Sequence, residues 1–415
     1  MRKDARPPRA VTQEQADSLA AAAIAGSWTL SGLAERFSNA GAADAELLAR
    51  RVLDLMPSEP IGGETSVRNM LAELPHLPKA DVDVSVTEST VWRFGVPRWQ
   101  TPAALCHTFT LTMPELEWFA DVQGRLRNKP GPLHHYRYRN GPRLIEAPKQ
   151  RLREIQRRIL HNVLGKVPVH SAAHGFTRGR SVYTFASGHA GAAIVVKMDL
   201  RWFFSTIGAS RVRALFSSFG YPPTVSALLT GLCTTATPVA VVRGMPYEQA
   251  SFLRARHLPQ GAPTSPALAN LAARNLDRRL AALSRSRGLH YSRYADDLAF
   301  SGDWVNVEQL LWTVREIVRD EGFFVHHSKT KVMREHRQQR LTGLIVNQQP
   351  QASRMDFDSL KALLFNCIRY GAASQNRDGL PHFREYVRGR IAWVGESNPR
   401  RLGKLRALER RIVWE

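Results

Sequence analysis

Two aspartate-bearing segments constrain the fold of this chain more than any other feature. Residues 293–300 (RYADDLAF) place Asp296 and Asp297 side by side in an alternating aromatic and apolar pattern that predicts a hairpin. Residues 192–200 (AAIVVKMDL) form an apolar run that predicts a buried strand with Asp199 near its end. Adjacent carboxylates repel each other, so this arrangement destabilises the fold unless a cation lies between them. We therefore expect both segments to be neighbours in one sheet, around divalent metal ions.

The order of predicted elements between residues 192 and 333 is strand, helices, hairpin, helix and strand. That order suits an antiparallel sheet backed by helices, so the predicted fold class is α+β. Consecutive strand residues point to opposite sides of a sheet. We therefore expect Asp296 to be the stronger metal ligand beside Asp199, and Asp297 the weaker or purely electrostatic one, unless the turn redirects it.

Helical periodicity predicts a helical N-terminal extension over residues 1–56. Residues 57–111 open with a segment rich in proline and glycine and continue with a β-rich run, so we treat them as a linker and a region without a predicted partner. Residues 346–415 carry three amphipathic helices whose polar faces are rich in arginine. Their apolar faces comprise Phe357, Leu360, Leu364, Cys367 and Ile368, then Phe383, Val387, Ile391 and Val394, then Leu402, Leu405, Leu408 and Ile412.

The charge balance indicates a polyanionic partner, because 58 Lys and Arg residues against 36 Asp and Glu residues give a net charge of +22. The basic residues are spread along the chain and interleaved with aromatic residues, which favours nucleic acid over a membrane surface. A merely soluble basic protein is the alternative. The chain has neither a secretory signal nor an apolar run long enough for a membrane span, so we expect a cytoplasmic protein that contacts no membrane.

Carboxylates in this arrangement suit phosphoryl transfer from a nucleoside triphosphate. That reaction uses two divalent ions about 3.5–4 Å apart, of which one activates the attacking hydroxyl and the other holds the leaving group. Magnesium prefers oxygen ligands and binds a few carboxylates together with water. A Tyr-x-Asp-Asp sequence alone is a weak signal, since aspartate-rich surface turns are common.

The motif does not stand alone. The ordered series KMDLRWFF, LPQGAPTSP, RYADDLAF, HSKTK and LTGLIVN resembles the motif series of reverse transcriptases, most closely the retron type of bacteria. The resemblance covers about residues 132–415 and includes HYRYRNGPRLIEAP, HGFTRGRS and LRALERRI. It implies a right-hand RNA-directed DNA polymerase, with fingers and a ferredoxin-like palm over residues 112–345 and a helical thumb over residues 346–415.

The resemblance also implies roles for the residues that match the motifs. Asp199, Asp296 and Asp297 correspond to the catalytic carboxylates that bind two Mg²⁺ ions, or Mn²⁺ in their place, and the carbonyl of Leu200 is a further implied ligand. Lys329 matches a lysine that protonates the pyrophosphate leaving group, although a salt-bridged surface lysine is an equal alternative.

The implied nucleotide-binding residues are Arg139, Arg143, Phe204, Gln260 and Gly261. Phe204 would lie under the incoming sugar, where an aromatic ring clashes with a 2′-hydroxyl and selects dNTPs; the alternative is a core residue beside Phe203. The glycine would allow close backbone approach to the nucleotide. The two arginines match residues that clamp the triphosphate through their planar set of donors.

RNA or template contacts are implied at Arg178 in HGFTRGRS and at His189 in FASGH. The basic faces of the C-terminal helices, with Arg384, Arg388 and Lys404, suit a phosphate backbone; an ordinary solvated surface is the alternative. FASGH matches the Asn-Ala-x-x-His box of retron enzymes except that phenylalanine replaces the asparagine, and FFST stands where FFPS is commoner. LTG resembles the VTG segment of the same group. These departures leave the polymerase chemistry untouched and fall in segments associated with recognition of the RNA.

The resemblance therefore implies an enzyme that copies a structured non-coding RNA into DNA. In retron systems that RNA also supplies a 2′-hydroxyl primer, the product is an RNA–DNA molecule, and the system defends against phage with an effector protein. Three alternatives remain: another bacterial reverse transcriptase of the abortive-infection or group II intron type, an RNA-dependent RNA polymerase, and an RNA-binding scaffold without catalysis. Loss of a catalytic aspartate would favour the scaffold, and none is lost.

Overall fold

A computed structural model of the chain describes residues 13–42, 45–56, 59–60, 63–73, 91–141 and 143–414. The chain divides into two compact units, Met1–Glu88 and Ser89–Glu415, and each is described by itself. None of the described helices combines the length and the apolar character that crossing a lipid bilayer requires.

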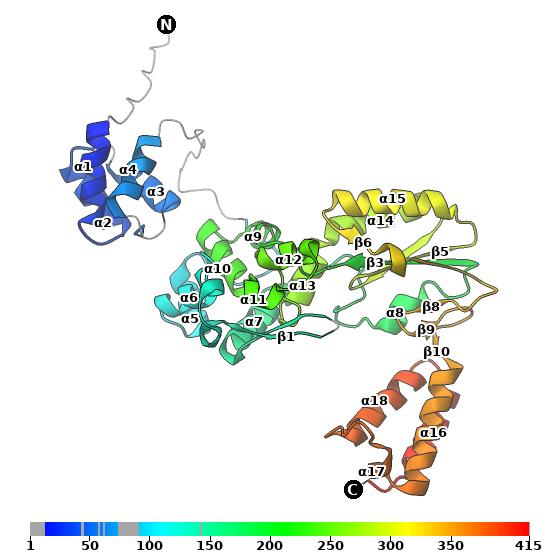
Figure 1. Cartoon of the computed structure of the whole chain (residues 1–415). Helices are drawn as coiled ribbons and strands as arrows, with labels where there is room; N and C mark the ends of the chain where they lie inside the picture. Colours follow the sequence, from blue (N-terminus) through cyan, green and yellow to red (C-terminus); the bar gives the residue numbers. More distant parts are fainter. Residues whose placement is uncertain are drawn as a thin grey trace. The chain divides into compact units, whose positions relative to one another are not determined.

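The first unit is a small helical bundle (Figure 1). It comprises α1 (Gln13–Ile24), α2 (Leu30–Asn39), α3 (Ala45–Leu55) and α4 (Gly63–Glu73). Leu33 and Phe37 of α2 are fully buried, and Val67 and Leu71 of α4 complete the same core. The predicted helical extension is thus present, but it does not end at residue 56, because α4 lies in the segment predicted to be a linker. Residues 82–90, which make up most of the predicted β-rich run, lie outside the described residues.

The second unit begins with a helical layer that belongs to the fingers. Val96, Trp99, Leu105 and Phe109 are buried in the main hydrophobic core, so residues 91–111 pack within the second unit and do not form a linker. The elements of this region are α5 (Pro102–Phe109), α6 (Met113–Ala120), β1 (Tyr136–Arg139), β2 (Ile145–Pro148), α7 (Gln150–Asn162), α10 (Pro223–Cys233), α11 (Val239–Val242) and α12 (Tyr247–Arg254). Strands β1 and β2 form an antiparallel hairpin.

The palm is built around β3 (Ile194–Arg201), the central strand of a five-stranded antiparallel sheet. Its sheet partners are β5 (Asp297–Gly302) on one side and β6 (Phe324–Val325) and β7 (Lys331–Arg334) on the other, and β4 (His290–Tyr294) forms the edge beyond β5. Helices α14 (Arg274–Ser286) and α15 (Val307–Asp320) lie on one side of these strands (Figure 1), and α9 (Ala209–Ser218) and α13 (Ser265–Ala272) join the same core. The predicted α+β palm is confirmed.

Alternation along β3 explains why the carboxylates lie on the face opposite the helices. Val196 and Met198 point into the core beneath the helices, whereas Val195 packs on the other face. That face is covered by α8 (Val182–Ser187) and by a three-stranded sheet of β8 (Arg340–Leu341), β9 (Leu344–Ile345) and β10 (Gln351–Ala352). Lys197 and Asp199 share the face of Val195, because strand side chains repeat every two residues.

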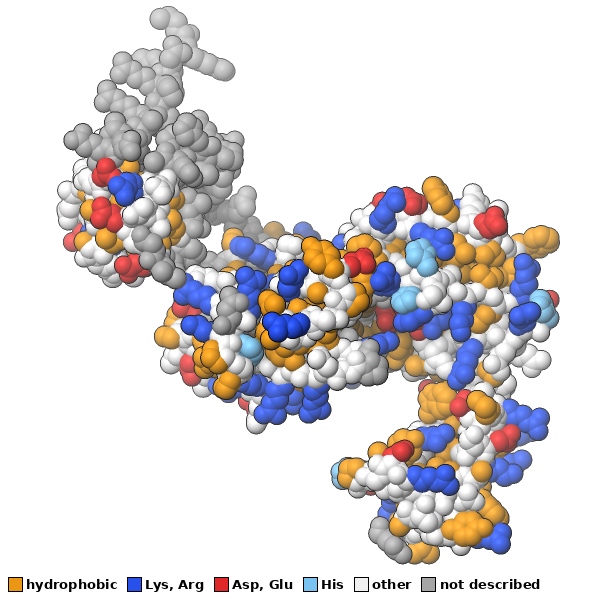
Figure 2. Space-filling view, viewed as in Figure 1, with side chains coloured by type: hydrophobic (Ala, Val, Ile, Leu, Met, Phe, Trp, Pro, Cys, Tyr) orange, Lys and Arg blue, Asp and Glu red, His pale blue; other side chains and the backbone are white. Residues whose placement is uncertain are grey.

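The C-terminal helices form the predicted thumb bundle: α16 (Arg354–Tyr370), α17 (Ala372–Gln375), α18 (Phe383–Gly395) and α19 (Pro399–Glu409). The apolar faces predicted from periodicity meet in one cluster, in which Leu360, Leu364, Val387 and Leu405 are fully buried. Figure 2 shows Lys and Arg side chains spread over the visible face of the second unit, in keeping with the net charge of +22.

Candidate active site

The sheet brings the three aspartates together. Asp199 lies directly opposite Asp297 in the β3–β5 ladder, so their side chains share one face of the sheet. The backbone N–H of Leu200 donates to the carbonyl of Asp296 at 2.9 Å, which places the turn of the hairpin beside the end of β3. The expectation that the two segments are sheet neighbours is therefore confirmed.

Two lysines partly neutralise this cluster. The Nζ of Lys197 lies 2.9 Å from Oδ2 of Asp297, and the Nζ of Lys329 lies 3.1 Å from Oδ1 of Asp199. Burial, reinforced by the charge of Asp199, raises the pKa of Asp296 above its ordinary value. Burial also raises the pKa of Asp297, although Lys197 opposes the shift. Asp296 thus has a destabilised negative charge, and within the described part of the chain no lysine forms an ion pair with it, although the charges of Arg143 and Lys329 partly offset the rise of its pKa.

A cleft of about 480 Å³ opens in front of the sheet. Asp199, Leu200, Asp296 and Lys329 line it, whereas Asp297 is not among the lining residues. The side chain of Asp297 is instead held by Lys197. The expected ranking of Asp296 over Asp297 as a metal ligand agrees with this arrangement and stays a prediction.

The donor set fits a hard divalent cation. The carboxylates of Asp199 and Asp296 and the backbone of Leu200 offer only oxygen ligands to the cleft, which is the preference of Mg²⁺ and Mn²⁺. A cation between Asp199 and Asp296 would also relieve the repulsion that raises the pKa of Asp296. Within the described residues, no three His, Cys, Asp or Glu side chains form a complete metal cage, so water, the substrate or a side-chain rearrangement must complete the coordination.

Phe203 and Phe204 have different surroundings. Both line the cleft, but Phe203 is only 4% exposed and belongs to the main core, whereas Phe204 is partly exposed and packs against that core. The centroid of the Phe204 ring lies 6.4 Å from that of Phe176, another residue of the cleft wall. The alternative that one of the two phenylalanines is a core residue therefore applies to Phe203.

The predicted nucleotide-binding loop also reaches the cleft. Gln260 lines it, and its carbonyl accepts from the backbone N–H of Glu146 in β2 at 2.8 Å. Gly261 has a φ of +131°, and a Cβ atom there would lie 3.1 Å from the carbonyl oxygen of Glu146. Glycine is therefore required at position 261 because the backbone there packs closely against β2 of the fingers.

The two fingers arginines differ in position. Arg143 lines the cleft, and its charge lowers the pKa of Asp296 against the larger opposing effects of burial and Asp199. Arg139 is exposed at the end of β1 and is not among the lining residues. The structure therefore brings Arg143, and not Arg139, to the predicted triphosphate site.

The prediction that His189 contacts RNA is wrong. Its side chain is fully buried, and its ring nitrogens lie 2.8 Å from the hydroxyls of Ser301 and Ser292. Burial lowers the pKa of His189 to about 3, so the imidazole is neutral. His189 therefore connects β4 and β5, the two strands of the aspartate hairpin.

The other predicted RNA contacts lie on the surface and outside the cleft. Arg178 is exposed two residues after Phe176. In the thumb, Arg388 pairs with Glu409 at 2.6 Å, Arg384 lies 5.9 Å from the Trp414 ring, and Lys404 is exposed. Their predicted roles in binding RNA stay predictions.

Sequence reasoning missed a buried ion pair at the wall of the cleft, where Glu146 is one of the lining residues. Glu146 Oε2 lies 2.9 Å from Nε2 of His257, and the hydroxyl of Thr237 donates to the other carboxylate oxygen at 2.7 Å. The negative charge of Glu146 raises the pKa of His257 despite its burial. The pair fixes β2 to the segment that leads into Gln260. Nothing local marks these residues, because they are far apart in the sequence.

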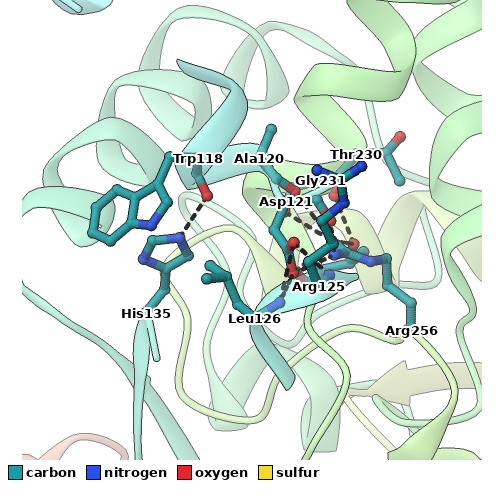
Figure 3. Close-up of polar contacts among 10 residues, drawn as sticks. Trp118, Ala120, Asp121, Arg125, Leu126, His135, Thr230, Gly231 and Arg256 are labelled. Atoms are coloured by element: carbon teal, nitrogen blue, oxygen red, sulfur yellow. Dashed lines mark hydrogen bonds and ion pairs between the residues drawn. The ribbon is translucent and has the colours of Figure 1, made fainter. Parts of the chain in front are cut away.

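A second fingers contact was also missed. The guanidinium of Arg256 donates to the carbonyls of Ala120, Gly231 and Asp121, while the carboxylate of Asp121 accepts from the backbone N–H of Arg125 at 2.8 Å (Figure 3). These bonds join the ends of α6 and α10.

The comparisons with known proteins agree with this geometry. Residues 128–346 match the family model described as reverse transcriptase (RNA-dependent DNA polymerase). The retron Mx65 reverse transcriptase of Myxococcus xanthus is 36% identical over 78% of this chain and 74% of its own length. The retron Mx162 reverse transcriptase of the same organism is 36% identical over 76% of this chain and 68% of its own length.

A third relative, the retron Ec86 reverse transcriptase of Escherichia coli, is 33% identical over 50% of this chain and 59% of its own length. A reverse transcriptase domain implies dependence on a divalent metal, in agreement with the oxygen donors of the cleft. The chain therefore belongs to the reverse transcriptase family, and within it to the retron reverse transcriptases, which are RNA-directed DNA polymerases.

Proposed function

We propose that the chain extends a DNA strand on a structured non-coding RNA, using dNTPs and two Mg²⁺ ions, or Mn²⁺ in their place. The observation that carries this proposal is the shared cleft of Asp199 and Asp296, with Asp297 directly across the ladder from Asp199. Asp199, Asp296 and the carbonyl of Leu200 would hold the ions. Bound ions would supply activation of the 3′-hydroxyl and neutralisation of the triphosphate.

The cleft wall provides the remaining parts of a nucleotide site. Arg143 offers a planar set of donors to the triphosphate. Phe204 presents a ring where a 2′-hydroxyl would clash, which favours deoxynucleotides. Lys329 lines the cleft, and its side chain is 49% exposed. Once a bound substrate replaces its contact with Asp199, Lys329 can give a proton to the leaving pyrophosphate.

The similarity to retron enzymes supports a specific biological setting. We place the protein in a cytoplasmic retron system, in which the non-coding RNA serves as template and primer and an effector protein acts with it in defence against phage. The basic thumb surface, which includes Arg384 and Lys404, suits the backbone of the RNA–DNA duplex. The first, helical unit is available for the RNA or for the effector.

Sequencing the nucleic acid that copurifies with the protein from its host tests this function. A discrete RNA joined to a short DNA is the expected result. The variants Asp296→Asn and Asp297→Asn should retain the RNA and lose the DNA, whereas Asp378→Asn, at an exposed thumb position, should retain both. DNA that persists in the active-site variants contradicts the proposed metal site, and RNA that is never joined to DNA favours another type of bacterial reverse transcriptase.

A further inference from the structure

The turn that presents Asp296 has an unfavourable backbone conformation. Ala295 has a φ of +55°, in the left-handed region that residues other than glycine rarely adopt. The loop containing Gly175 packs closely against this turn, since a Cβ on Gly175 would lie 2.5 Å from the backbone nitrogen of Ala295. Surrounding groups must therefore hold the turn in place.

Arg293 supplies the most direct of these restraints. Its Nη1 donates to the carbonyl of Ala295 at 3.0 Å and to Oδ1 of Asn270 at 3.0 Å. Its Nε and Nη2 donate to the two carboxylate oxygens of Asp277 in α14 at 2.8 and 2.6 Å. The side chain is fully buried. One planar group therefore connects the catalytic turn to both α13 and α14.

The main chain around Arg293 extends the same network. Its N–H donates to the carbonyl of Ala172 at 2.7 Å, and its carbonyl accepts from the N–H of His174 at 2.8 Å. The side-chain amide of Asn270 donates to the carbonyl of Gly175 at 2.8 Å. Phe176, the next residue, lines the cleft. The network thus reaches the cleft on two sides, through Phe176 and through the Asp296 turn.

A need for stability does not account for a fully buried arginine. Taking the charges of Arg293 and Asp277 out of water is costly, and well-packed apolar residues of similar volume often give equal or greater stability. An apolar side chain would, however, leave the carbonyl of Ala295 without its donor. What the guanidinium provides in addition is the fixed geometry of its donors, which a lysine does not reproduce.

We infer that Arg293 is a positioning residue of the polymerase: by binding the carbonyl of Ala295 it fixes the direction in which Asp296 enters the cleft. The inference rests on the proposed metal-binding role of Asp296. Arg293 itself touches neither substrate nor metal. Its effect should therefore be seen in the affinity for the metal and in kcat, with little change in nucleic-acid binding.

The test uses the full-length protein bound to an RNA–DNA primer–template, with free Mn²⁺ measured by electron paramagnetic resonance. The ammonium of Arg293→Lys cannot reach Asp277 and Ala295 together. We expect its Mn²⁺ affinity to fall about tenfold or more, the usual effect of losing a group that orients a metal ligand. We expect kcat to fall with it, while duplex affinity stays within about twofold.

Tyr291→Phe is the matched control, because Tyr291 donates to Asp277 at 2.8 Å but does not contact Ala295. It should lower the melting temperature and leave Mn²⁺ affinity unchanged. The triple variant Arg293→Met, Asp277→Leu, Tyr291→Phe removes the buried charges together, so it should fold even if Arg293→Lys does not. It should still lose Mn²⁺ affinity.

Three outcomes distinguish a failure of the positioning role of Arg293 from a failure of the proposed function. Normal Mn²⁺ affinity and kcat in Arg293→Lys and in the triple variant would overturn the positioning role. Equal losses of Mn²⁺ affinity in Tyr291→Phe and Arg293→Lys would also overturn it, because the effect would then follow the packing of the network as a whole. A wild-type protein that makes no DNA on any RNA template would instead overturn the proposed function.

Discussion

Acidification should weaken the palm through His189, by an amount that follows from its surroundings. Burial lowers its pKa to about 3, from an ordinary value of 6.5. Below pH 6.5 the unfolded chain takes up a proton at this imidazole and the folded protein does not, so the unfolded state is favoured. The contribution to stability is therefore fully present above pH 6.5 and is lost as the pH falls towards 3.

The size of the effect is worked from the same two pKa values. One pH unit corresponds to about 1.4 kcal/mol for a group that titrates only in the unfolded state. At pH 5.0, about 1.5 units below the unfolded pKa, the free energy of unfolding should be lower by about 2 kcal/mol from His189 alone. At pH 7.5 this difference vanishes.

The assay compares wild type with His189→Gln in urea unfolding at pH 7.5 and pH 5.0, followed by far-UV circular dichroism. A glutamine amide can bond both Ser292 and Ser301 and stays neutral at both pH values. Burial also lowers the pKa of His174 and of His290, but both residues are present in both proteins, so most of their contribution cancels. An equal loss of stability in both proteins would refute the reasoning, since His189 would then not be the group responsible.

Further predictions concern the cleft. Phe204→Ala should raise the incorporation of ribonucleotides relative to deoxynucleotides in primer extension, and unchanged sugar selection would contradict the placement of Phe204 beneath the incoming sugar. Phe203→Ala should mainly lower the free energy of unfolding, by about 3–5 kcal/mol for a buried aromatic residue. Lys329→Gln should lower the single-turnover rate of incorporation about a hundredfold or more if the lysine is a general acid, and a rate within a factor of about three would leave it as an ion-pair partner of Asp199. Gly261→Ala should raise KM for dNTPs, because its Cβ would press on the carbonyl of Glu146; an unaltered KM would show that the loop adjusts.

Elements with strong local periodicity could be predicted from the sequence. The apolar run of β3, the hairpin at residues 290–302, and the apolar faces of α16, α18 and α19 depend on neighbours within a few residues and were confirmed. The alternation expected through the tip of the hairpin is interrupted by the turn at residues 295–296, because Tyr294 pairs with Asp297. Helix α4 was missed because proline and glycine before it indicate a linker. The chain instead begins a helix at Gly63, whose φ is +52°, and buries Val67 and Leu71.

The supports of the site could not be predicted, because residues distant in sequence determine them. His189 matched a motif that suggested RNA, but Ser292 and Ser301 lie more than a hundred positions away and enclose it. Arg293 stands beside two aspartates in a sequence typical of a surface turn. Its burial depends on its ion pair with Asp277, sixteen positions earlier in α14.

The most direct test of the account is single-turnover extension of a DNA primer on an RNA template in Mg²⁺. Asp199→Asn and Asp296→Asn should each slow incorporation about a thousandfold, equivalent to about 4 kcal/mol of lost transition-state stabilisation, while duplex affinity changes less than about twofold. Asp378→Asn should match wild type. Extension by either active-site variant within about tenfold of wild type would contradict the claim that these carboxylates jointly hold the metal ions of DNA synthesis.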